Sequence, residues 1–325
     1  MRIVSLLPSA TEIVCELGLG DQLVGVTHEC DFPAGVSGLP HLTRTRLSPT
    51  ASSSDIDAQV REQLSTRNSL YELDHDLLVE LKPDLIVTQS LCDVCAVSEQ
   101  DVRNALCRLP TGAQVVNLEP QRLDEVLDSL EAVAAAAGAP SRGVQARRGL
   151  EERIDSVIRS VAEPGDPGAA ERPRVVVLEW IDPPFSAGHW VPEIVELAGG
   201  REMIGQPGER SVTLSWEEVV AARPDVCFIS CCGFSIERTK LDLPVLFEHV
   251  AGHDLPCVQN GKIFVLDGSA FLSRPGPRLV TALELMAWAL SPERVQRPQE
   301  TTGIERVPVK KWNTEPGPAD VVCGT

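Results

Sequence analysis

The feature that most constrains the fold is a short pattern that occurs twice. The segments "LKPDLIVTQ" (81–89) and "ARPDVCFIS" (222–230) each place a proline between the end of an amphipathic stretch and a short apolar run. Proline cannot continue a helix, because it lacks the backbone N–H and its ring clashes with the preceding turn. The pattern therefore predicts a helix, a sharp stop and a buried strand, in the same order in both halves of the chain.

Similar strands and helices surround the two copies. In the first half we expect strands at 2–8, 23–28, 84–89 and 114–119, and helices at 10–18, 70–81, 97–108 and 121–137. In the second half we expect strands at 174–180, 225–230 and 262–267, a short extended piece near Met203, and helices at 191–199, 215–222 and 242–251. Short apolar strands that alternate with amphipathic helices are typical of parallel, helix-covered sheets. The sequence thus predicts an α/β fold of two similar Rossmann-like lobes.

A long amphipathic helix is expected between the halves. Its apolar positions are Val144, Leu150, Ile154, Val157, Ile158 and Val161, and charged residues fill the opposite face. The expected organisation is an N-terminal lobe at 1–138, a linking helix at 139–163, a C-terminal lobe at 164–295 and a poorly structured tail at 296–325. A ligand cleft is expected between the lobes, and the polar segment 40–69 is expected to be a long loop near it.

Composition limits the partners. The 325 residues include 47 acidic and 29 basic ones, a formal net charge of −18, which argues against nucleic acid or an anionic membrane surface as the main partner. The sequence has no run of 18 apolar residues, so no membrane span is expected. Its N-terminus does not have the pattern of a signal peptide, which predicts a cytoplasmic protein with reduced thiols, or a periplasmic or extracellular one if the true start lies upstream.

Residues that follow the expected strands would line the cleft. They combine aromatic side chains with a few polar groups, a composition that suits a large, flat, partly apolar ligand. The candidate ligand-binding residues are Pro8, Ser9, His28, Gln89, Trp180, Phe185, His189, Trp190, Phe271 and Arg274. Several have a simpler structural interpretation: Ser9 could cap a helix, His28 a turn, and the two tryptophans could belong to the core.

Several segments together resemble a known family. "RIVSLLPSATEIVCELGLGDQLVGVTHECDFP", "WIDPPFSAGHWVPEIVELAGG", "SWEEVVAARPDV" and "SRPGPRLVTALELMA" are similar to the cobalamin-binding members of the periplasmic-binding-protein family of ABC importers, the helical-backbone metal-chelate receptors. The resemblance spans roughly residues 2–292. It implies two α/β lobes joined by one long helix, with a corrinoid held between them by aromatics and backbone. It also implies docking on a permease through acidic residues, for which Glu99 and Glu248 are the candidates, if the protein is exported.

The "CDVC" segment (92–95) leaves three interpretations open. The two thiols could be a redox pair, metal ligands, or small apolar residues packed at a turn. As a metal site they would join Cys30 and Cys232, because thiolates are ligands that Zn²⁺ and other borderline metals accept. We expect Cys92 and Cys95 to lie close to His28 and Cys30.

The sequence favours a soluble binding protein that holds a cobalamin-like corrinoid, or a related metal chelate, for uptake, storage or hand-over. No nucleophile stands beside a base in any recognisable motif, so an enzyme is not expected. The alternative is a cytoplasmic protein with a Zn or Fe site made of cysteine and histidine, regulatory or enzymatic, that reuses the same fold.

Overall fold

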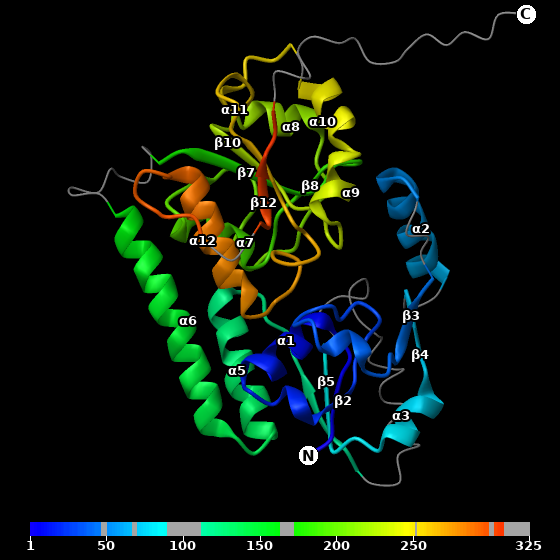
Figure 1. The fold of residues 1–325 in the computed structure, drawn as a ribbon. Helices are drawn as coiled ribbons and strands as arrows, with labels where there is room; N and C mark the ends of the chain where they lie inside the picture. The colour runs from blue at the N-terminus through cyan, green and yellow to red at the C-terminus, as the bar shows by residue number, and fades with distance from the viewer. Residues whose placement is uncertain are drawn as a thin grey trace, which may run out of the picture. The chain divides into compact units, whose positions relative to one another are not determined.

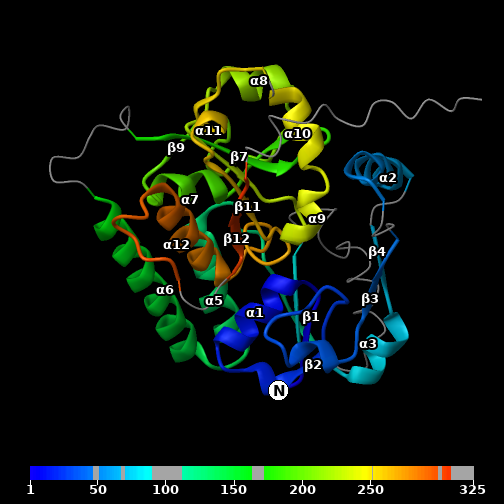
Figure 2. The ribbon, with the colours of Figure 1, turned by 45° about the horizontal axis from the view of Figure 1, so that its top comes forward.

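The computed structural model describes residues 1–46, 51–66, 70–89, 112–162, 172–250, 252–298 and 302–308. It divides into two compact units (Figures 1 and 2). The first comprises Met1–Arg159 together with Arg274–Leu283, and the second comprises Ser160–Ser273 and Glu284–Thr325. A short segment from late in the chain therefore belongs to the first unit.

The first unit is built on a four-stranded parallel sheet. Its strands, in the order β2-β1-β5-β6, are Leu23–Gly25, Ile3–Ser5, Leu85–Thr88 and Gln114–Asn117. All four fall inside the strands that the sequence predicts. The central strands β1 and β5 are fully buried, as expected for a sheet that is covered on both faces.

Helices cover both faces of this sheet. α1 (Pro8–Glu16) and α5 (Leu123–Ala136) lie on one side, and α3 (His75–Leu81) lies on the other (Figure 1). The α3 side has a core made of Val4, Leu6, Leu42, Leu73, Leu78 and Ile86. Because successive strand residues point to opposite faces, Leu85 and Val87 face the α1 side.

Two expectations for the first unit are wrong. Segment 40–69 is not simply a loop, because Thr43–Thr45 (β3) pairs antiparallel with Tyr71–Leu73 (β4), and Ser53–Thr66 forms α2. The helix expected at 70–81 begins only at His75, where the Asp74 side chain accepts a hydrogen bond from the Leu77 N–H at 2.9 Å. The expected helix at 97–108 lies outside the described residues.

The second unit has a larger sheet of order β12-β11-β10-β7-β8, with β9 also paired to β7. Its strands are β7 (Arg174–Trp180), β8 (Phe185–Ser186), β9 (Arg201–Glu202), β10 (Val226–Ile229), β11 (Ile263–Leu266) and β12 (Ile304–Arg306). β9, β7, β10 and β11 are parallel, and β8 and β12 are antiparallel additions at the two edges. The expectation of a poorly structured tail at 296–325 is therefore wrong for residues 304–306.

The helices of the second unit again lie on both faces of its sheet (Figure 2). They are α7 (Val191–Leu197), α8 (Trp216–Ala221), α9 (Ile236–Lys240), α10 (Leu243–Val250), α11 (Pro256–Gln259) and α12 (Arg278–Leu290). α7, α8 and α10 match sequence predictions to within two residues at each end. α12 begins in the first unit and ends in the second.

The repeated proline motif has the same structure in both units. Lys82 and Arg223 each lie within two residues after a helix, have a left-handed backbone with φ values of 46° and 44°, and precede a proline. The next residue in each copy, Asp84 or Asp225, accepts a hydrogen bond from the backbone N–H at the start of the neighbouring strand, from Arg2 or Arg174. The motif therefore ties each helix–strand turn to the adjacent strand.

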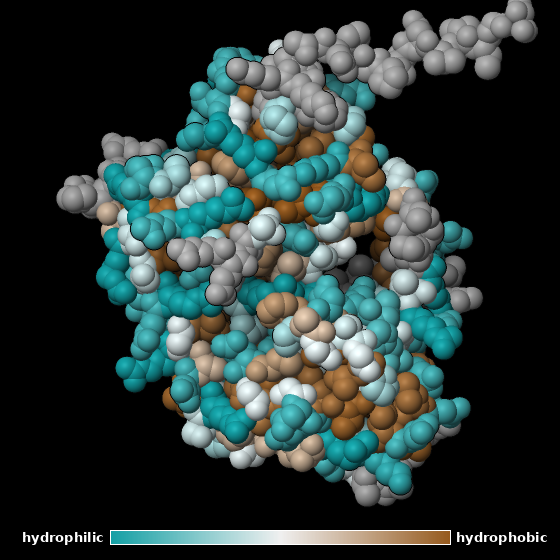
Figure 3. Space-filling view, in the orientation of Figure 1, coloured by the Kyte–Doolittle hydropathy of each residue, from teal (hydrophilic) through white to brown (hydrophobic). Residues whose placement is uncertain are grey.

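The long helix α6 spans Pro140–Val161. Leu150, Ile154 and Val157 are buried along one side, and much of the rest of the helix surface is hydrophilic (Figure 3). Two apolar positions of the expected stripe, Val144 and Ile158, are instead 57% and 39% exposed. Arg147 bridges Asp128 of α5 and Glu151 of α6 itself, which ties the two helices together. Among the described helices, none is long and apolar enough to cross a bilayer.

Candidate ligand-binding site

The predicted ligand-binding residues of the first unit follow the carboxyl ends of its parallel strands, where ligands of open α/β sheets bind. Pro8 and Ser9 open α1 just beyond β1. His28 lies three residues beyond β2, and Gln89 directly follows β5. Because these three strands are neighbours in the sheet, the residues lie along one edge of it, and their role in binding a ligand stays a prediction.

Ser9 and Gln89 are buried and unsatisfied. Their exposed fractions are 1% and 5%. In the described part of the chain, neither the Ser9 Oγ nor the Gln89 Oε1 has a hydrogen-bond partner. Leu7 is the N-cap residue of α1 and offers no side-chain hydrogen bond, so the alternative interpretation of Ser9 as a helix cap is wrong.

His28 is partly buried, and within the described residues only one of its two ring nitrogens has a hydrogen-bond partner. Its Nδ1 lies 2.7 Å from the Thr43 Oγ1, and its ring lies 5.5 Å from the ring of Tyr71. The Tyr71 hydroxyl donates to Glu29 at 3.1 Å. The His28 Nε2 is buried and lacks a hydrogen-bond partner within the described residues. The ring therefore has a fixed orientation and an unused nitrogen.

The local environment favours neutral His28. Burial lowers its pKa, and nearby His41 acts in the same direction, while Glu29 opposes them. A neutral imidazole is the form that can accept a hydrogen bond or donate electrons to a metal.

The pKa direction gives a testable pH dependence. A folded-state pKa below the unfolded value of about 6.5 contributes stability that is present above that value and is lost as pH falls through the folded pKa. We expect the stability advantage of the wild type over His28→Gln to shrink between pH 7 and pH 5. Urea unfolding of both proteins across this range checks the expectation. Parallel pH profiles would contradict it.

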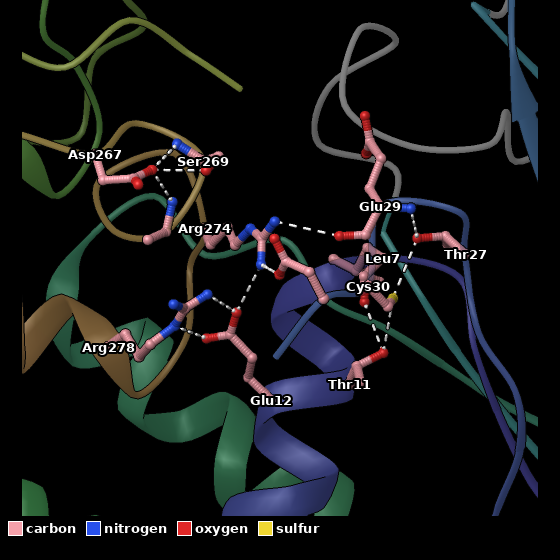
Figure 4. A network of polar contacts seen from close by, with 12 residues as sticks. Leu7, Thr11, Glu12, Thr27, Glu29, Cys30, Asp267, Ser269, Arg274 and Arg278 are labelled. Atoms are coloured by element: carbon pink, nitrogen blue, oxygen red, sulfur yellow. Dashed lines mark hydrogen bonds and ion pairs between the residues drawn. The ribbon is translucent and has the colours of Figure 1, made fainter. Parts of the chain in front are cut away.

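Arg274, which the sequence predicts to bind ligand, is instead held by acidic residues of the first unit. Its Nη1 lies 3.1 Å from the Glu12 Oε1 and 2.6 Å from the Asp31 Oδ1, and its Nη2 donates to the Glu29 carbonyl at 3.2 Å (Figure 4). Only 9% of Arg274 is exposed. Whether it also contacts ligand stays a prediction.

Arg278 completes this ion-pair cluster. It forms a bidentate pair with Glu12, with Nε–Oε2 and Nη2–Oε1 distances of 2.9 and 2.5 Å. Its guanidinium also lies 4.3 Å from the ring centre of Phe32, a residue on the loop that carries Asp31. Arg278, the first residue of α12, and Arg274, which precedes the helix, thus share the carboxylate of Glu12 on α1, a residue that is 3% exposed. Bidentate, charge-assisted hydrogen bonds of this kind are stronger than hydrogen bonds between neutral groups.

Cys30 is a buried thiol rather than an open metal ligand. Its Sγ lies 3.0 Å from the Thr11 Oγ1 and 3.1 Å from the Thr27 Oγ1. Burial raises its pKa, which disfavours the thiolate that metals require. Cys232 is exposed in the second unit, and Cys92 and Cys95 lie outside the described residues. Over the described ranges, no three His, Cys, Asp or Glu side chains are grouped so as to hold a metal.

In the second unit, an aromatic cluster follows β7 and β10. The Trp180 ring lies 4.7 Å from that of Phe234, and the Arg238 guanidinium stacks 4.2 Å from the Phe234 ring centre. The Trp180 Nε1 donates to the Asp182 carbonyl at 3.1 Å. Trp180 therefore lies at a strand end, as predicted, with part of its surface exposed.

The other predicted aromatics of this unit divide into two groups. Phe185 is half-buried in β8. Trp190 and Phe271 are 6% and 5% exposed, and the Trp190 Nε1 donates to the Leu272 carbonyl at 2.9 Å. Packing in the interior accounts for these two side chains in this structure, and a ligand contact for them stays a prediction.

His189 has a constrained backbone. Its φ is 52°, and the residue is fixed by its N–H to the Glu209 carbonyl at 2.6 Å and by its own carbonyl, which accepts from Gly208. Burial and the charge of Arg210 lower its pKa. A non-glycine residue in this backbone region often marks a functional position.

Of the two predicted docking residues, Glu248 is exposed on α10, and Glu99 lies outside the described residues. Sequence reasoning missed Glu12, which pairs with both arginines, and Asp31, which pairs with Arg274. Glu12 could have been singled out from the sequence, because it is an acidic residue between Ala10 and Ile13 in the apolar part of the expected helix. In the structure this part of α1 is buried. Its partners could not be predicted, because they lie more than 260 positions away.

Comparisons with known proteins agree with this architecture. A "Vitamin B12-binding protein" of Vibrio cholerae is 25% identical over 298 residues, which cover 87% of this chain and 86% of that protein. Two solved structures are also similar. One is the periplasmic vitamin B12 binding protein BtuF of Vibrio cholerae, with a TM-score of 0.62 and 23% identity over 89% of this chain and 96% of that one. The other is the periplasmic heme-binding protein RhuT from Roseiflexus sp. RS-1, with a TM-score of 0.66 and 23% identity over 89% of this chain and 97% of that one.

At these identities the solved structures establish the fold alone, and they confirm two α/β lobes of this type. Residues 3–270 also match the family described as "Periplasmic binding protein". This match covers most of the chain and confirms the resemblance seen in the sequence. The protein therefore belongs to the periplasmic binding protein family, whose members bind solutes and are not enzymes.

Proposed function

We propose that this protein binds a cobalamin-like corrinoid. The observation that carries the proposal is the similarity to the vitamin B12-binding protein of Vibrio cholerae, which extends over 87% of the chain. The aromatic residues at or near strand ends in the second unit support it, because Trp180, Phe185 and Phe234 provide half-buried or buried aromatic surface for a flat ring.

Transfer of the ligand to an ABC importer permease is part of this proposal. Glu248 on α10 is exposed and remains our candidate for a docking contact. The location of the protein in the cell stays a prediction. The alternative of a cytoplasmic protein with a Cys/His metal site gains no support from the described residues, since no such group occurs among them.

An absorbance titration followed by gel filtration tests the proposal. We expect hydroxocobalamin and cyanocobalamin to co-elute with the protein at one corrinoid per chain, and hemin to bind more weakly. A spectral shift of the hydroxo form alone would indicate an axial ligand, for which the unused Nε2 of His28 is the candidate. Tight hemin binding without corrinoid binding at micromolar protein would refute the proposal.

A matched pair of variants locates the site. Trp180→Ala should weaken corrinoid binding by about tenfold or more, a loss of about 1.4 kcal/mol. Trp216→Ala serves as the control, because Trp216 is also a partly buried tryptophan of the second unit but begins α8 and stacks on His249. Equal losses in both variants would contradict a site at the end of β7.

A further inference from the structure

The uncapped start of α1 and two unsatisfied side chains lie at one corner of the first unit. Ser9 is in the first turn of α1, and Gln89 directly follows β5. β1, which leads into α1, pairs with β5 so that Ser5 is opposite Val87. By the alternation of strand residues, Gln89 points to the same side of the sheet as Val87, the side that α1 covers.

The unsatisfied atoms need an explanation. A buried polar group without a hydrogen bond costs about 1–3 kcal/mol, and native proteins retain few of them. The Gln89 Oε1 and the Ser9 Oγ are both without a partner in the part of the chain that the structure describes. Ser230, at the position of the second proline motif equivalent to Gln89, is also buried with an unsatisfied hydroxyl. The stability of the fold does not explain why the equivalent positions 89 and 230 are polar.

The corner offers both kinds of hydrogen-bonding group. The first backbone N–H groups of a helix have no partner within the helix, and α1 has no side-chain cap to accept from them. The Gln89 Oε1 is a hydrogen-bond acceptor, and the Ser9 hydroxyl can act as a donor or as an acceptor. A group that donates and accepts at neighbouring atoms therefore suits the corner best.

The charges nearby do not favour an anion. The two arginines of this edge, Arg274 and Arg278, are both ion-paired with Glu12, and Arg274 also pairs with Asp31. A ligand carboxylate would have to compete with these protein carboxylates for the same guanidinium groups. A neutral group avoids this competition.

We infer that this corner binds a neutral carboxamide group of the ligand, which donates its N–H to the Gln89 Oε1 and accepts from the backbone N–H groups of α1. The inference rests on the proposed function, because a corrinoid ring carries primary carboxamides whereas haem carries carboxylates. Both protein atoms are shielded from solvent, so the hydrogen bonds contribute more than they would at the surface. The Gln89 side chain can rotate about its single bonds to meet the group while its backbone stays at the end of β5.

Two corrinoids that carry either amides or carboxylates on the side chains of the same ring test the inference. Dicyanocobinamide carries side-chain amides, and dicyanocobyrinic acid carries carboxylates at the corresponding positions. The net charge of −18 should by itself weaken binding of the polyacid. The deciding quantity is therefore the change in the ratio of the two affinities when Gln89 is replaced by methionine, which has a similar shape but no acceptor oxygen.

We expect Gln89→Met to bind cobinamide about tenfold more weakly, to lower the preference for cobinamide by a similar factor, and to keep the melting temperature of the wild type. Thr88→Val is the matched control. Thr88 is also buried and unsatisfied at the end of β5, but it points to the α3 side, so its replacement should leave the affinity ratio unchanged. Ser9→Ala provides a second, independent variant, with a smaller loss of the same sign.

The outcomes separate this inference from the proposed function. If wild type binds cobinamide and Gln89→Met shows the same affinity ratio, the inference is wrong and the proposed function stands. A marked fall in melting temperature for Gln89→Met would also overturn it, since Gln89 would then have a structural partner. If wild type binds neither corrinoid, the proposed function fails and this inference fails with it.

Discussion

Replacing Glu12 with glutamine should lower the free energy of unfolding by about 3–5 kcal/mol, the usual cost of removing one partner of a buried ion pair. Glu12 is 3% exposed and is the shared acceptor of Arg274 and Arg278. Without its negative charge, two largely buried guanidinium groups lose their common counter-ion. Asp31 can compensate only in part, because of the two arginines it pairs with Arg274 and not with Arg278 among the described contacts, and its side chain is 61% exposed.

Urea unfolding followed by circular dichroism measures this effect. Glu16→Gln is the control, because it makes the same chemical change on the same helix at an exposed position. Its effect should stay within about 0.5 kcal/mol. A double variant that replaces Glu12 with glutamine and Arg278 with methionine should recover part of the loss. Equal stability of the Glu12 and Glu16 variants would show that the buried cluster contributes nothing to folding.

Replacing Gly268 with alanine should destabilise the protein by about 3 kcal/mol, at the upper end of the range for overpacking. A Cβ atom at this position would lie 1.9 Å from the backbone oxygen of Cys231. The obstacle is main chain, so it cannot rotate away as a side chain would. Relief requires separation of the loops after β10 and β11, which are joined by a hydrogen bond from the Ser269 N–H to the Phe234 carbonyl.

The displacement should also affect binding, because Phe234 belongs to the aromatic cluster with Trp180. We expect weaker corrinoid binding by Gly268→Ala at temperatures where the variant is still folded. Gly38→Ala is the control, since an added Cβ there meets no atom within 4 Å. Thermal unfolding of both variants checks the first expectation and the absorbance titration checks the second. A melting temperature for Gly268→Ala within 1 °C of the control would count against both.

Much of the fold could be predicted because its signals are local. The proline motif at 81–89 and 222–230 marks a helix end and a strand start within a few residues, and both occur as predicted. The linking helix was predicted from its apolar stripe. The failures occurred where a distant partner decides the structure: residues 71–73 became a strand because they pair with 43–45, and residues 304–306 because they pair with β11.

The candidate site follows the same division. Ser9, His28 and Gln89 in the first unit and Trp180 in the second could be assigned to strand ends, because the parallel strands of each sheet bring their carboxyl ends to one edge of that sheet. Their surroundings could not be predicted, because they depend on contacts between remote positions. The sequence does not reveal that Thr43 holds His28, that Phe234 contacts Trp180, or that Glu12 accepts from both arginines.

The assignment of Arg274–Leu283 to the first unit has a consequence for how this protein can diverge. A single genetic crossover between the coding regions of the two units would give a hybrid whose α1 and α12 come from different parents. Glu12 would then face arginines, or their replacements, that had never been selected beside it. Such hybrids should be viable mainly when two crossovers transfer residues 1–159 and 274–283 together, so the coding regions of these two segments are expected to share one ancestry even where the region between them has been exchanged.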